Sequence, residues 1–268
     1  KRGQKINKSP IQGMAETLNL EFRTPNFLKD NLEEYDYFKK INADLAIVVA
    51  YGQIIPKKFL NLTKKGFFNI HASILPNWRG AAPIQRSIMN LDKETGVSVM
   101  KIVEKLDAGP ICNVYKINLE NNLNASVVSE KLSSLAAQNI LENIDDILED
   151  KAKFLEQDHS KATYASKIEK IEGKIEWNNS ARSIIGQING LYPSPGAFFM
   201  FKGERYKILQ AKIGNGIGNP GEVVSDYMEV VCGDNQSIKV LEIQRQGKKP
   251  QNIGEFMLGS QIKKGSKI

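Results

Sequence analysis

The sequence predicts an α/β protein in which a largely parallel sheet is followed by a small antiparallel β-barrel. Residues 44–50 and 66–71 form continuous apolar runs bounded by glycine, which is typical of strands buried on both faces of a parallel sheet. Helical patterns alternate with these runs. From residue 163 onward, short strands are separated by glycine, proline and asparagine instead. The chain of 268 residues is long enough for two domains, each with its own core.

The first half is predicted to alternate helices with strands. Ser9-Pro10 is a turn signal, and the apolar spacing behind it predicts a short helix. The last two strands of this half are expected to pair like a hairpin, and a long amphipathic helix follows them. The expected ranges, in chain order, are a helix at 11–18, a strand at 20–22, a helix at 31–42, a strand at 44–50, a helical turn at 57–62, a strand at 66–71, a helix at 82–91, strands at 96–103 and 111–117, and a helix at 125–149.

The second half is predicted to curl into the barrel. Its expected elements are strands at 197–201, 206–211, 228–232 and 238–243, with one helix at 180–188 near the start. Residues 150–165 are polar and aperiodic, so we expect domains at 1–149 and 166–268 joined by a linker at 150–165. Ligands bind at the carboxyl ends of parallel strands, which places the expected site in the first domain.

The charge of the chain is unevenly distributed. There are 37 Lys and Arg against 30 Asp and Glu, a formal net charge of +7. Residues 1–8 hold four basic residues and no acid, residues 165–268 hold 15 basic against 10 acidic residues, and the stretch between them holds 18 against 20. Two basic flanks around a near-neutral body suit a polyanionic partner such as nucleic acid, although an ordinary lysine coat has the same composition.

Composition argues against several classes of protein. No apolar run reaches the length of a membrane helix or of a secretion signal, so we expect a cytoplasmic protein without membrane contact. Cys112 and Cys232 show no Cys-x-x-Cys spacing, and the two histidines lie 88 positions apart, which disfavours disulfide frameworks and metal sites. No Gly-x-Gly-x-x-Gly motif joins a strand to a helix, which argues against a dinucleotide oxidoreductase.

Candidate catalytic residues lie at the end of the second buried strand. Asn69 and His71 are two positions apart, so their side chains share one face of that strand. A histidine alone in apolar surroundings is by default structural. Asp107, two positions before Gly109, adds an acid beside a residue that permits a sharp reversal, and a lone Asp-x-Gly is a weak signal. The combination of the three polar residues makes them candidates for catalysis.

With these residues the chain resembles the folate-dependent formyltransferases. The shared features are Asn69-Ile70-His71, Ser73-Ile74-Leu75-Pro76 and Asp107-Ala108-Gly109. The one departure within the loop is Ile74, where the family has leucine of similar volume. The continuation from Trp78 to Gln85, and the segments at 50–56, 193–197 and 247–250, are similar to the branch that acts on methionyl initiator tRNA rather than on a purine precursor. The resemblance runs along essentially the whole chain.

The resemblance implies a fold and a reaction. The expected fold is a Rossmann-like parallel-sheet formyltransferase domain followed by an OB-like barrel that binds tRNA, in a monomer. The expected reaction moves the formyl group of 10-formyltetrahydrofolate, without a metal, to the α-amino group of methionyl initiator tRNA for translation initiation. The residues expected to hold the folate are Tyr51, Gly52, Gln53, Ile54, Ser73, Ile74, Leu75 and Pro76. Backbone donors among apolar side chains suit a flat heterocycle, although Ile54 or Leu75 taken singly fits an ordinary core equally well.

The chemistry of the reaction assigns roles to the three polar residues. Formyl transfer to an amine passes through a tetrahedral carbon whose oxygen becomes anionic, so the site needs a fixed hydrogen-bond donor. We expect Asn69 and His71 to supply donors. Asp107, hydrogen-bonded to His71, is expected to polarise the imidazole and to accept or relay a proton, either directly or through water.

Basic residues on both flanks are expected to contact the tRNA. Arg2 and Lys5 match a loop that in the family reaches toward the acceptor end, where arginine can clamp phosphate or stack on a base. In the barrel, Lys248 and Lys249 are the favoured contacts, although any single lysine there fits an ordinary surface charge as well. Further candidates in the barrel are Lys202, Arg205, Lys207 and Lys212.

Two other functions remain open at this point. A related formyltransferase acting on a small amine would need neither basic flanks nor a barrel. A nucleic-acid-binding module without catalysis is the other, and the intact Asn69, His71 and Asp107 argue against it. By resemblance, we expect the chain to lack the first strand and first helix of the family. We therefore expect it to fold poorly when expressed alone, because neighbouring strands would expose unpaired backbone groups.

Overall fold

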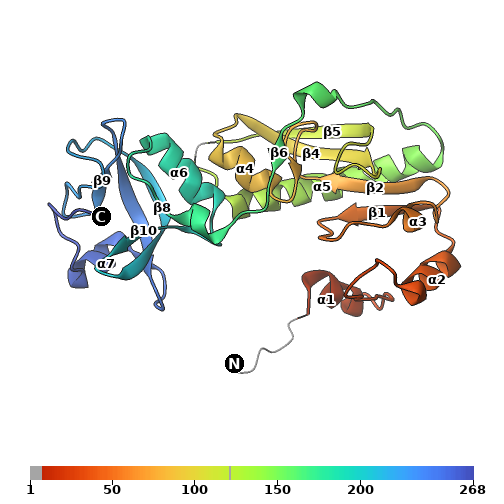
Figure 1. Ribbon diagram of the computed structural model, residues 1–268, viewed down its shortest axis with the longest axis horizontal. Coiled ribbons are helices and arrows are strands. Elements are labelled where there is room, and N and C mark those ends of the chain that lie inside the picture. The colour runs from red at the N-terminus through yellow and green to blue at the C-terminus, as the bar shows by residue number, and fades with distance from the viewer. Residues whose placement is uncertain (1–7, 121) are drawn as a thin grey trace.

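The computed structural model describes residues 8–120 and 122–268. Two units lie end to end, one built on a four-stranded sheet and the other on a curled five-stranded sheet (Figure 1). The first unit contains, in chain order, α1 (Pro10–Thr17), α2 (Leu32–Ile41), β1 (Leu45–Val49), α3 (Lys57–Leu60), β2 (Gly66–His71), β3 (Arg79–Gly80), α4 (Pro83–Met89), β4 (Glu94–Lys101), β5 (Ile111–Asn118) and α5 (Ala125–Leu148). The rest of the chain contains η1 (His159–Lys161), β6 (Tyr164–Ala165), η2 (Lys170–Gly173), α6 (Ala181–Gly190), β7 (Ala197–Phe201), β8 (Glu204–Gly214), β9 (Glu229–Val231), β10 (Ser237–Arg245), β11 (Gln251–Asn252) and α7 (Ile253–Gly259).

The sheet of the first unit is mixed, with the order β1-β2-β4-β5. β1 runs parallel to β2, whereas β4 is antiparallel to both β2 and β5. The hairpin-like pair is therefore confirmed, but the expectation of a largely parallel sheet holds for β1 and β2 alone. The chain enters β4 near the end at which it left β2, so these two strands run in opposite directions.

Two further expectations for the first unit are wrong. The strand at 44–50 was predicted to be buried on both faces, but β1 lies at the edge of the sheet, and Val49 is 60% exposed. Within the described residues β1 pairs with β2 alone, so one side of it lacks a covering strand. Residues 20–22 form no strand, because no neighbouring strand pairs with them, and the side chains of Leu20 and Phe22 are exposed.

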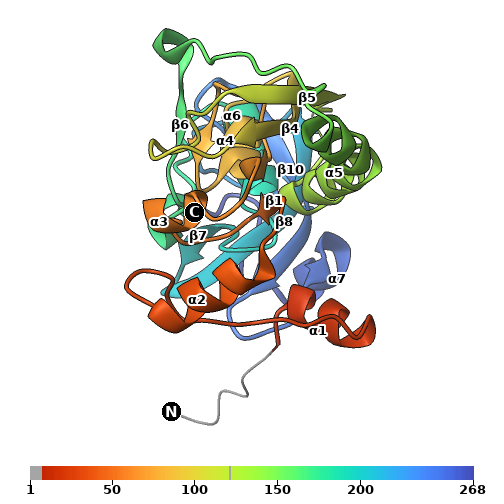
Figure 2. The same cartoon turned by 90° about the vertical axis from the view of Figure 1, so that its right-hand side faces the viewer.

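The core of the first unit lies between α4, α5 and the sheet. Val97 of β4 and Ile88 of α4 pack against the first two turns of α5, through Ala125, Val128 and Leu132. Seen along the long axis, α5 and β6 lie on opposite sides of β4 (Figure 2). The helices and strands predicted at 11–18, 31–42, 57–62, 66–71, 82–91, 96–103, 111–117 and 125–149 are all present, with ends shifted by a few residues.

The second unit is an antiparallel sheet curled around its own core. Its order is β11-β10-β8-β7, with β9 on β10, and β8 pairs along most of its length with β10. The first helix of this unit, α6, buries Ile184 and Ile188 against Phe199 and Ile208. A curled antiparallel sheet with one early helix is what the spacing of short strands predicts, whereas β11 and α7 were not predicted.

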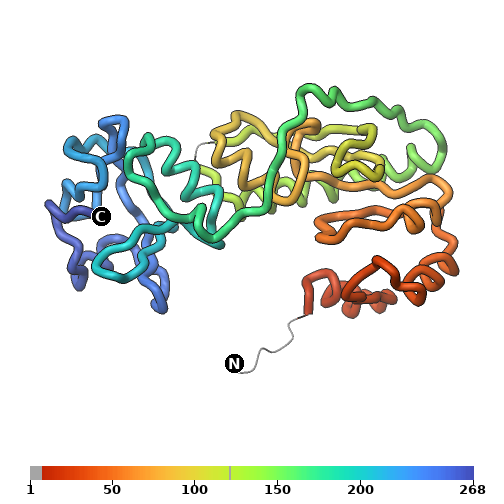
Figure 3. Tube along the Cα trace, in the orientation of Figure 1, coloured from red at the N-terminus to blue at the C-terminus, as the bar shows by residue number. Residues whose placement is uncertain are grey.

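The segment between the two units returns along the first sheet before it enters the second (Figure 3). Leu155 bridges to Ile111 at the start of β5, and Phe154 stacks on Phe68 of β2 with ring centroids 5.9 Å apart. β6 then pairs in parallel with β3. This segment is thus held against the first unit over most of its length.

Candidate active site

Asn69 and His71 lie at the carboxyl end of β2, and their side chains are on the face that contacts the loop after β4. The register sets Asn69 opposite Met100 and His71 opposite Ser98. His71 is only 5% exposed, whereas Asn69 is partly open. The alternation of a strand therefore places an amide and an imidazole side by side, as the sequence predicts.

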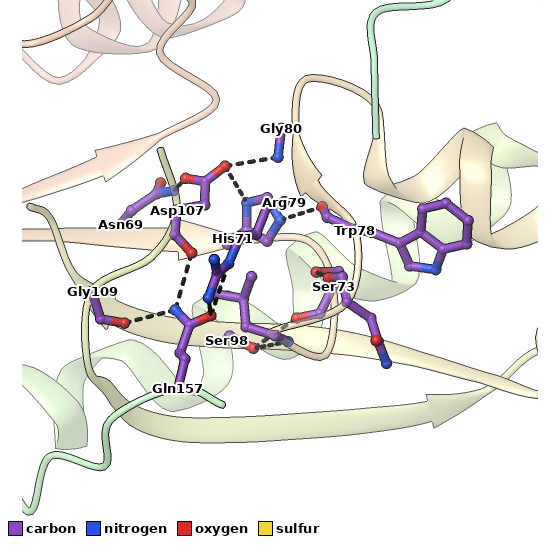
Figure 4. A network of polar contacts seen from close by, with 12 residues as sticks. Asn69, His71, Ser73, Trp78, Arg79, Gly80, Ser98, Asp107, Gly109 and Gln157 are labelled. Atoms are coloured by element: carbon purple, nitrogen blue, oxygen red, sulfur yellow. Dashed lines mark hydrogen bonds and ion pairs between the residues drawn. The ribbon is translucent and has the colours of Figure 1, made fainter. Parts of the chain in front are cut away.

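Asp107 reaches this face from the loop between β4 and β5 (Figure 4). Its carboxylate accepts a hydrogen bond from the Gly80 backbone N–H at 2.9 Å and from the Asn69 amide at 3.3 Å. The His71 Nδ1 atom lies 3.7 Å from Oδ2 of Asp107, within ion-pair range and beyond hydrogen-bond length. The expected hydrogen bond between Asp107 and His71 is therefore not formed. Three groups, two from β2 and one from β3, thus converge on one carboxylate, and the Asp107 side chain is 14% exposed.

The other nitrogen of His71 fixes the tautomer of the ring. Nε2 lies 2.9 Å from the main-chain oxygen of Trp78, and a carbonyl oxygen can only accept a hydrogen bond. Nε2 therefore carries a proton, and in the neutral ring Nδ1 has its lone pair toward Asp107. This arrangement can take up one proton at Nδ1, and the carboxylate beside it stabilises the resulting imidazolium.

The loop at residues 73–76 is fixed to β4 immediately beside His71. Ser98 Oγ donates to the carbonyl of Ser73 at 2.7 Å and accepts from the Leu75 N–H at 3.1 Å. Ser73 Oγ donates to the Asn77 carbonyl at 2.6 Å. Ser73 and Leu75 are buried, and Ile74 and Pro76 are half-buried. These hydrogen bonds therefore hold the loop in a fixed position next to His71.

The loop after β1 lies at the same edge of the sheet. Val49 pairs with Ile70, so the chain leaves β1 at the level of His71. Tyr51 and Ile54 are 42% and 87% exposed, whereas the Gln53 side chain bonds to the backbone of residues 26 and 28. Exposed apolar side chains thus stand next to a polar cluster, an arrangement suited to a flat ligand with polar edges.

The basic residues of the second unit that are expected to contact tRNA lie away from Asn69, His71 and Asp107. Arg2 and Lys5 fall outside the described residues. Lys248 and Lys249 line a cavity of about 640 Å³ in the second unit, together with Phe201, Lys202 and Arg245. The cavity is open to solvent, and four basic side chains line it against the two carboxylates of Glu204 and Glu255. The Lys202 ammonium lies 5.5 Å from the Phe201 ring. The structure therefore places the catalytic candidates in the first unit and Lys248 and Lys249 in the second.

Two polar residues near the site were missed from the sequence. The Arg79 side chain is completely buried, and Gln157 is 6% exposed. Gln157 stands in a polar, aperiodic stretch, so no periodicity marks it, and its burial depends on a residue 78 positions away. Arg79 lies within the stretch that carries the resemblance, but nothing local to it shows that its side chain points inward.

Other kinds of site receive no support from the described part of the chain. Within residues 8–120 and 122–268, no cluster of three or more His, Cys, Asp or Glu side chains could hold a metal ion. None of the described helices combines the length and the apolar character that a membrane span requires.

Comparison with known proteins gives matches along the whole chain. The family described as "Formyl transferase" matches residues 2–144, and that described as "Formyl transferase, C-terminal domain" matches residues 167–261. A protein of Pelagibacter ubique named methionyl-tRNA formyltransferase is 67% identical over 267 residues, covering 100% of this chain and 86% of its own. One of the same name from Chelativorans sp. is 39% identical, covering 100% of this chain and 87% of its own.

Solved structures share the fold at lower identity. WlaRD, a sugar 3N-formyl transferase determined in the presence of dTDP and 5-N-formyl-THF, aligns with a TM-score of 0.69 and 22% identity, over 90% of this chain and 83% of that chain. HypX from Aquifex aeolicus in complex with tetrahydrofolic acid aligns with a TM-score of 0.66 and 18% identity, over 88% of this chain and 42% of that chain.

Proposed function

This chain belongs to the formyl transferase family, among the methionyl-tRNA formyltransferases, and on that premise we propose that it moves the formyl group of 10-formyltetrahydrofolate onto the α-amino group of methionyl initiator tRNA. The observation that carries the proposal is the convergence of Asn69, His71 and Asp107 at the carboxyl end of β2, in a chain 67% identical to a relative of that name. The first unit then serves as a Rossmann-like catalytic domain and the second as an OB-like tRNA-binding domain.

The reaction forms one bond and breaks another at the formyl carbon. The α-amine attacks the formyl carbon, and the formyl oxygen becomes anionic. The bond to the folate nitrogen then breaks as the formyl oxygen reforms its double bond to carbon. One proton leaves the amine and one reaches the departing nitrogen. The site therefore needs a donor for the oxygen and a group that can hold a proton between the two nitrogens.

Asn69 and His71 can meet these two needs. The Asn69 amide has two N–H donors and gives one to Asp107, so the second is available to the anionic oxygen. His71 Nδ1 presents its lone pair toward Asp107, where a proton from the amine can be held as the imidazolium. Asp107 keeps that charge balanced and, through a water, can also accept the proton itself.

The loops at 73–76 and 51–54 suit the folate. In the first, backbone groups are fixed next to His71 by the hydroxyls of Ser73 and Ser98. In the second, Tyr51 and Ile54 expose apolar surface that a pterin ring would cover. We propose that the co-substrate lies between them, with its formyl group toward Asn69.

Positive charge on the second unit suits the tRNA. Lys248 and Lys249 offer phosphate contacts, and Phe201, which lines the same cavity, offers an aromatic ring for a base. A small-amine acceptor would have no use for this cavity, and the 67% identical relative does not favour that alternative.

The test is transfer of labelled formyl from 10-formyltetrahydrofolate to methionyl initiator tRNA, with a panel of small amines as competing acceptors. We expect label on the tRNA and a loss of about two to three orders of magnitude in turnover for His71→Ala. Label on a small amine alone would keep the folate chemistry and refute the tRNA acceptor. Near-normal turnover in the His71 variant would remove that residue from the catalytic set.

A further inference from the structure

We infer that the segment at 155–165, which joins the two units, is part of the active site, and that Gln157 is a positioning residue that holds the backbone of Asp107 in register with His71. The inference deepens the proposed function and rests on it for the role of Asp107. It stands on contacts that connect the segment to the loop carrying Asp107 and to residues 79–81.

The first contact is made by the amide nitrogen of Gln157. It donates to the main-chain oxygen of Asp107 at 3.0 Å and to that of Gly109 at 2.7 Å. An amide nitrogen carries two hydrogens, so both are used on this one loop. Asp107 has a positive φ of 45°, a conformation that a residue other than glycine rarely adopts, so the loop needs outside support to keep it.

The second contact fixes which way the Gln157 amide points. Its oxygen accepts from Arg79 Nε at 3.1 Å and from Nη2 at 2.6 Å. A guanidinium can only donate, so the oxygen of Gln157 must face it and the nitrogen must face the loop. Arg79 is completely buried, and its Nη1 atom has no partner among the described residues.

A buried cation is costly unless something compensates its desolvation, and here no carboxylate of the described residues bonds to Arg79. Its Nη2 atom lies 2.9 Å from Nδ1 of His159. His159 is thus the second residue of the joining segment, after Gln157, that contacts Arg79. Because arginine donates, His159 Nδ1 accepts, which sets its tautomer as well. Arg79 thus holds Gln157 and His159 together.

The third and fourth contacts come from the β3–β6 pairing. The Arg79 N–H donates to the Thr163 carbonyl at 2.9 Å, and the Ala81 N–H donates to the Ala165 carbonyl at 2.8 Å. Gly80, between them, directs its own N–H to the carboxylate of Asp107. A Cβ on Gly80 would lie 2.7 Å from the Ala165 oxygen, so the two strands approach as closely as glycine allows.

Asp107 is therefore held at both ends by the same assembly. Gly80, positioned by β6, holds the carboxylate, and Gln157, oriented by Arg79, holds the carbonyl. An error of about 1 Å in the placement of a catalytic group can cost on the order of 100-fold in rate. Loss of the Gln157 contacts should accordingly reduce the rate of the chemical step and leave substrate binding unchanged.

The variant that tests this is Gln157→Glu in the full chain. Glutamate keeps the length and shape of the side chain and can still accept from Arg79, now as a charged pair. It loses both N–H donors and sets a carboxylate oxygen against the carbonyls of Asp107 and Gly109. The matched control is Gln187→Glu on α6, where the same amide donates to the carbonyls of Glu172 and Lys174 at 2.7 and 3.0 Å, in the other unit.

We expect kcat for formyl transfer to fall about 10- to 100-fold in Gln157→Glu, with KM for both substrates within about twofold of the wild-type value. The control should retain wild-type kcat. Gln157→Asn, which keeps the amide but is too short to span both carbonyls, should show the same fall and covers the case in which the glutamate variant does not fold. Unchanged kcat in both variants, or a fall explained by an equal fraction of unfolded protein, would overturn the inference.

A second readout does not depend on activity. The chain has two histidines, so imidazole NMR gives two ring signals, and His71→Ala assigns them. We expect the His71 signal to shift in Gln157→Glu and to stay in place in Gln187→Glu. If the wild-type protein formylated no tRNA, the proposed function would fail while this comparison still reported whether Gln157 controls the surroundings of His71. An unmoved His71 signal would overturn the positioning role.

Discussion

At the scale of single residues, the two N–H donors of the Asn69 amide have different roles. One of its N–H donors goes to Asp107, and the proposal assigns the other to the oxygen that becomes anionic during transfer. An amide held by a carboxylate cannot rotate away, so its second donor points in a fixed direction before the substrates arrive. Preorganised donors of this kind contribute more to the transition state than to substrate binding.

We predict that Asn69→Ala lowers kcat by two to three orders of magnitude, which corresponds to about 2.7–4 kcal/mol in the barrier, because the oxyanion loses its donor. KM for the tRNA should change little. The matched control is Asn118→Ala, which removes an exposed asparagine from the end of β5. Steady-state kinetics of both variants, with circular dichroism to verify folding, would decide the matter. A kcat for the Asn69 variant within tenfold of the control would exclude the oxyanion role.

At the scale of elements, α4 is tied to the second unit both by its packing on α6 and by a bidentate ion pair. Arg86 donates to Glu172 of η2 at 2.5 and 3.0 Å and also to the carbonyl of Ser166. The two charged side chains are 17% and 28% exposed. The hydrogen bonds from Arg86 are the main cause that lowers the pKa of Glu172. The pair joins the helix that follows the loop at 73–76 to the first turn of the second unit.

This pair should make stability depend on pH. Because the pKa of Glu172 is lower in the folded than in the unfolded chain, its contribution is complete above the unfolded pKa of about 4.3 and is lost as the pH falls through the folded pKa. We predict that Glu172→Gln lowers the free energy of unfolding by about 1–2 kcal/mol at pH 7, and that the difference from wild type shrinks in acid. The measurement is urea unfolding of both proteins from pH 7 down into acid. Glu176→Gln, which removes the exposed partner of Lys174, should have little effect at any pH. A difference for Glu172→Gln that persists unchanged into acid would contradict the assignment.

The elements also show where prediction from sequence succeeds. Long periodic helices such as α5, and strands with strong apolar runs such as β2, were predicted because their patterns are local. The burial of β1 was overestimated because the pattern reports what a strand can bury, whereas its exposure depends on which strands pair with it. β3 and β6 have two residues each, too few for any period, and were missed for that reason.

The same distinction between local patterns and long-range contacts applies to the residues of the site. Asn69 and His71 were predicted from strand alternation and Asp107 from its turn, and the structure brings all three together. Gln157 and Arg79 could not be predicted, because each is buried through a contact with the other across 78 positions of sequence. A polar side chain in an aperiodic stretch gives no local sign of such a partner.

At the scale of the whole molecule, the proposal assigns the chemistry to the first unit and the phosphate contacts to the second. Phosphate contacts displace bound counterions, so each one adds about 1 to the slope of the logarithm of affinity against the logarithm of salt concentration. We predict that Lys248→Ala and Lys249→Ala each reduce this slope for kcat/KM on tRNA by about 1 and leave kcat unchanged. Lys131→Ala, on the exposed face of α5, is the control and should leave the slope as it is. Equal slopes in all four proteins would place the tRNA on another surface.

The pairing of β6 with β3 also limits how this protein can be recombined with its relatives. A segment that merely tethered two modules could be cut anywhere, and the second unit could be exchanged by joining chains after α5. Here such a junction would replace the partner of Arg79 and the strand that fixes Gly80, both of which belong to the first unit by contact. A chimera joined after Ala165 keeps these parts together, whereas one joined before Leu155 inherits them from a foreign chain. For this molecule the boundary that matters to an engineer lies at the far end of the joining segment.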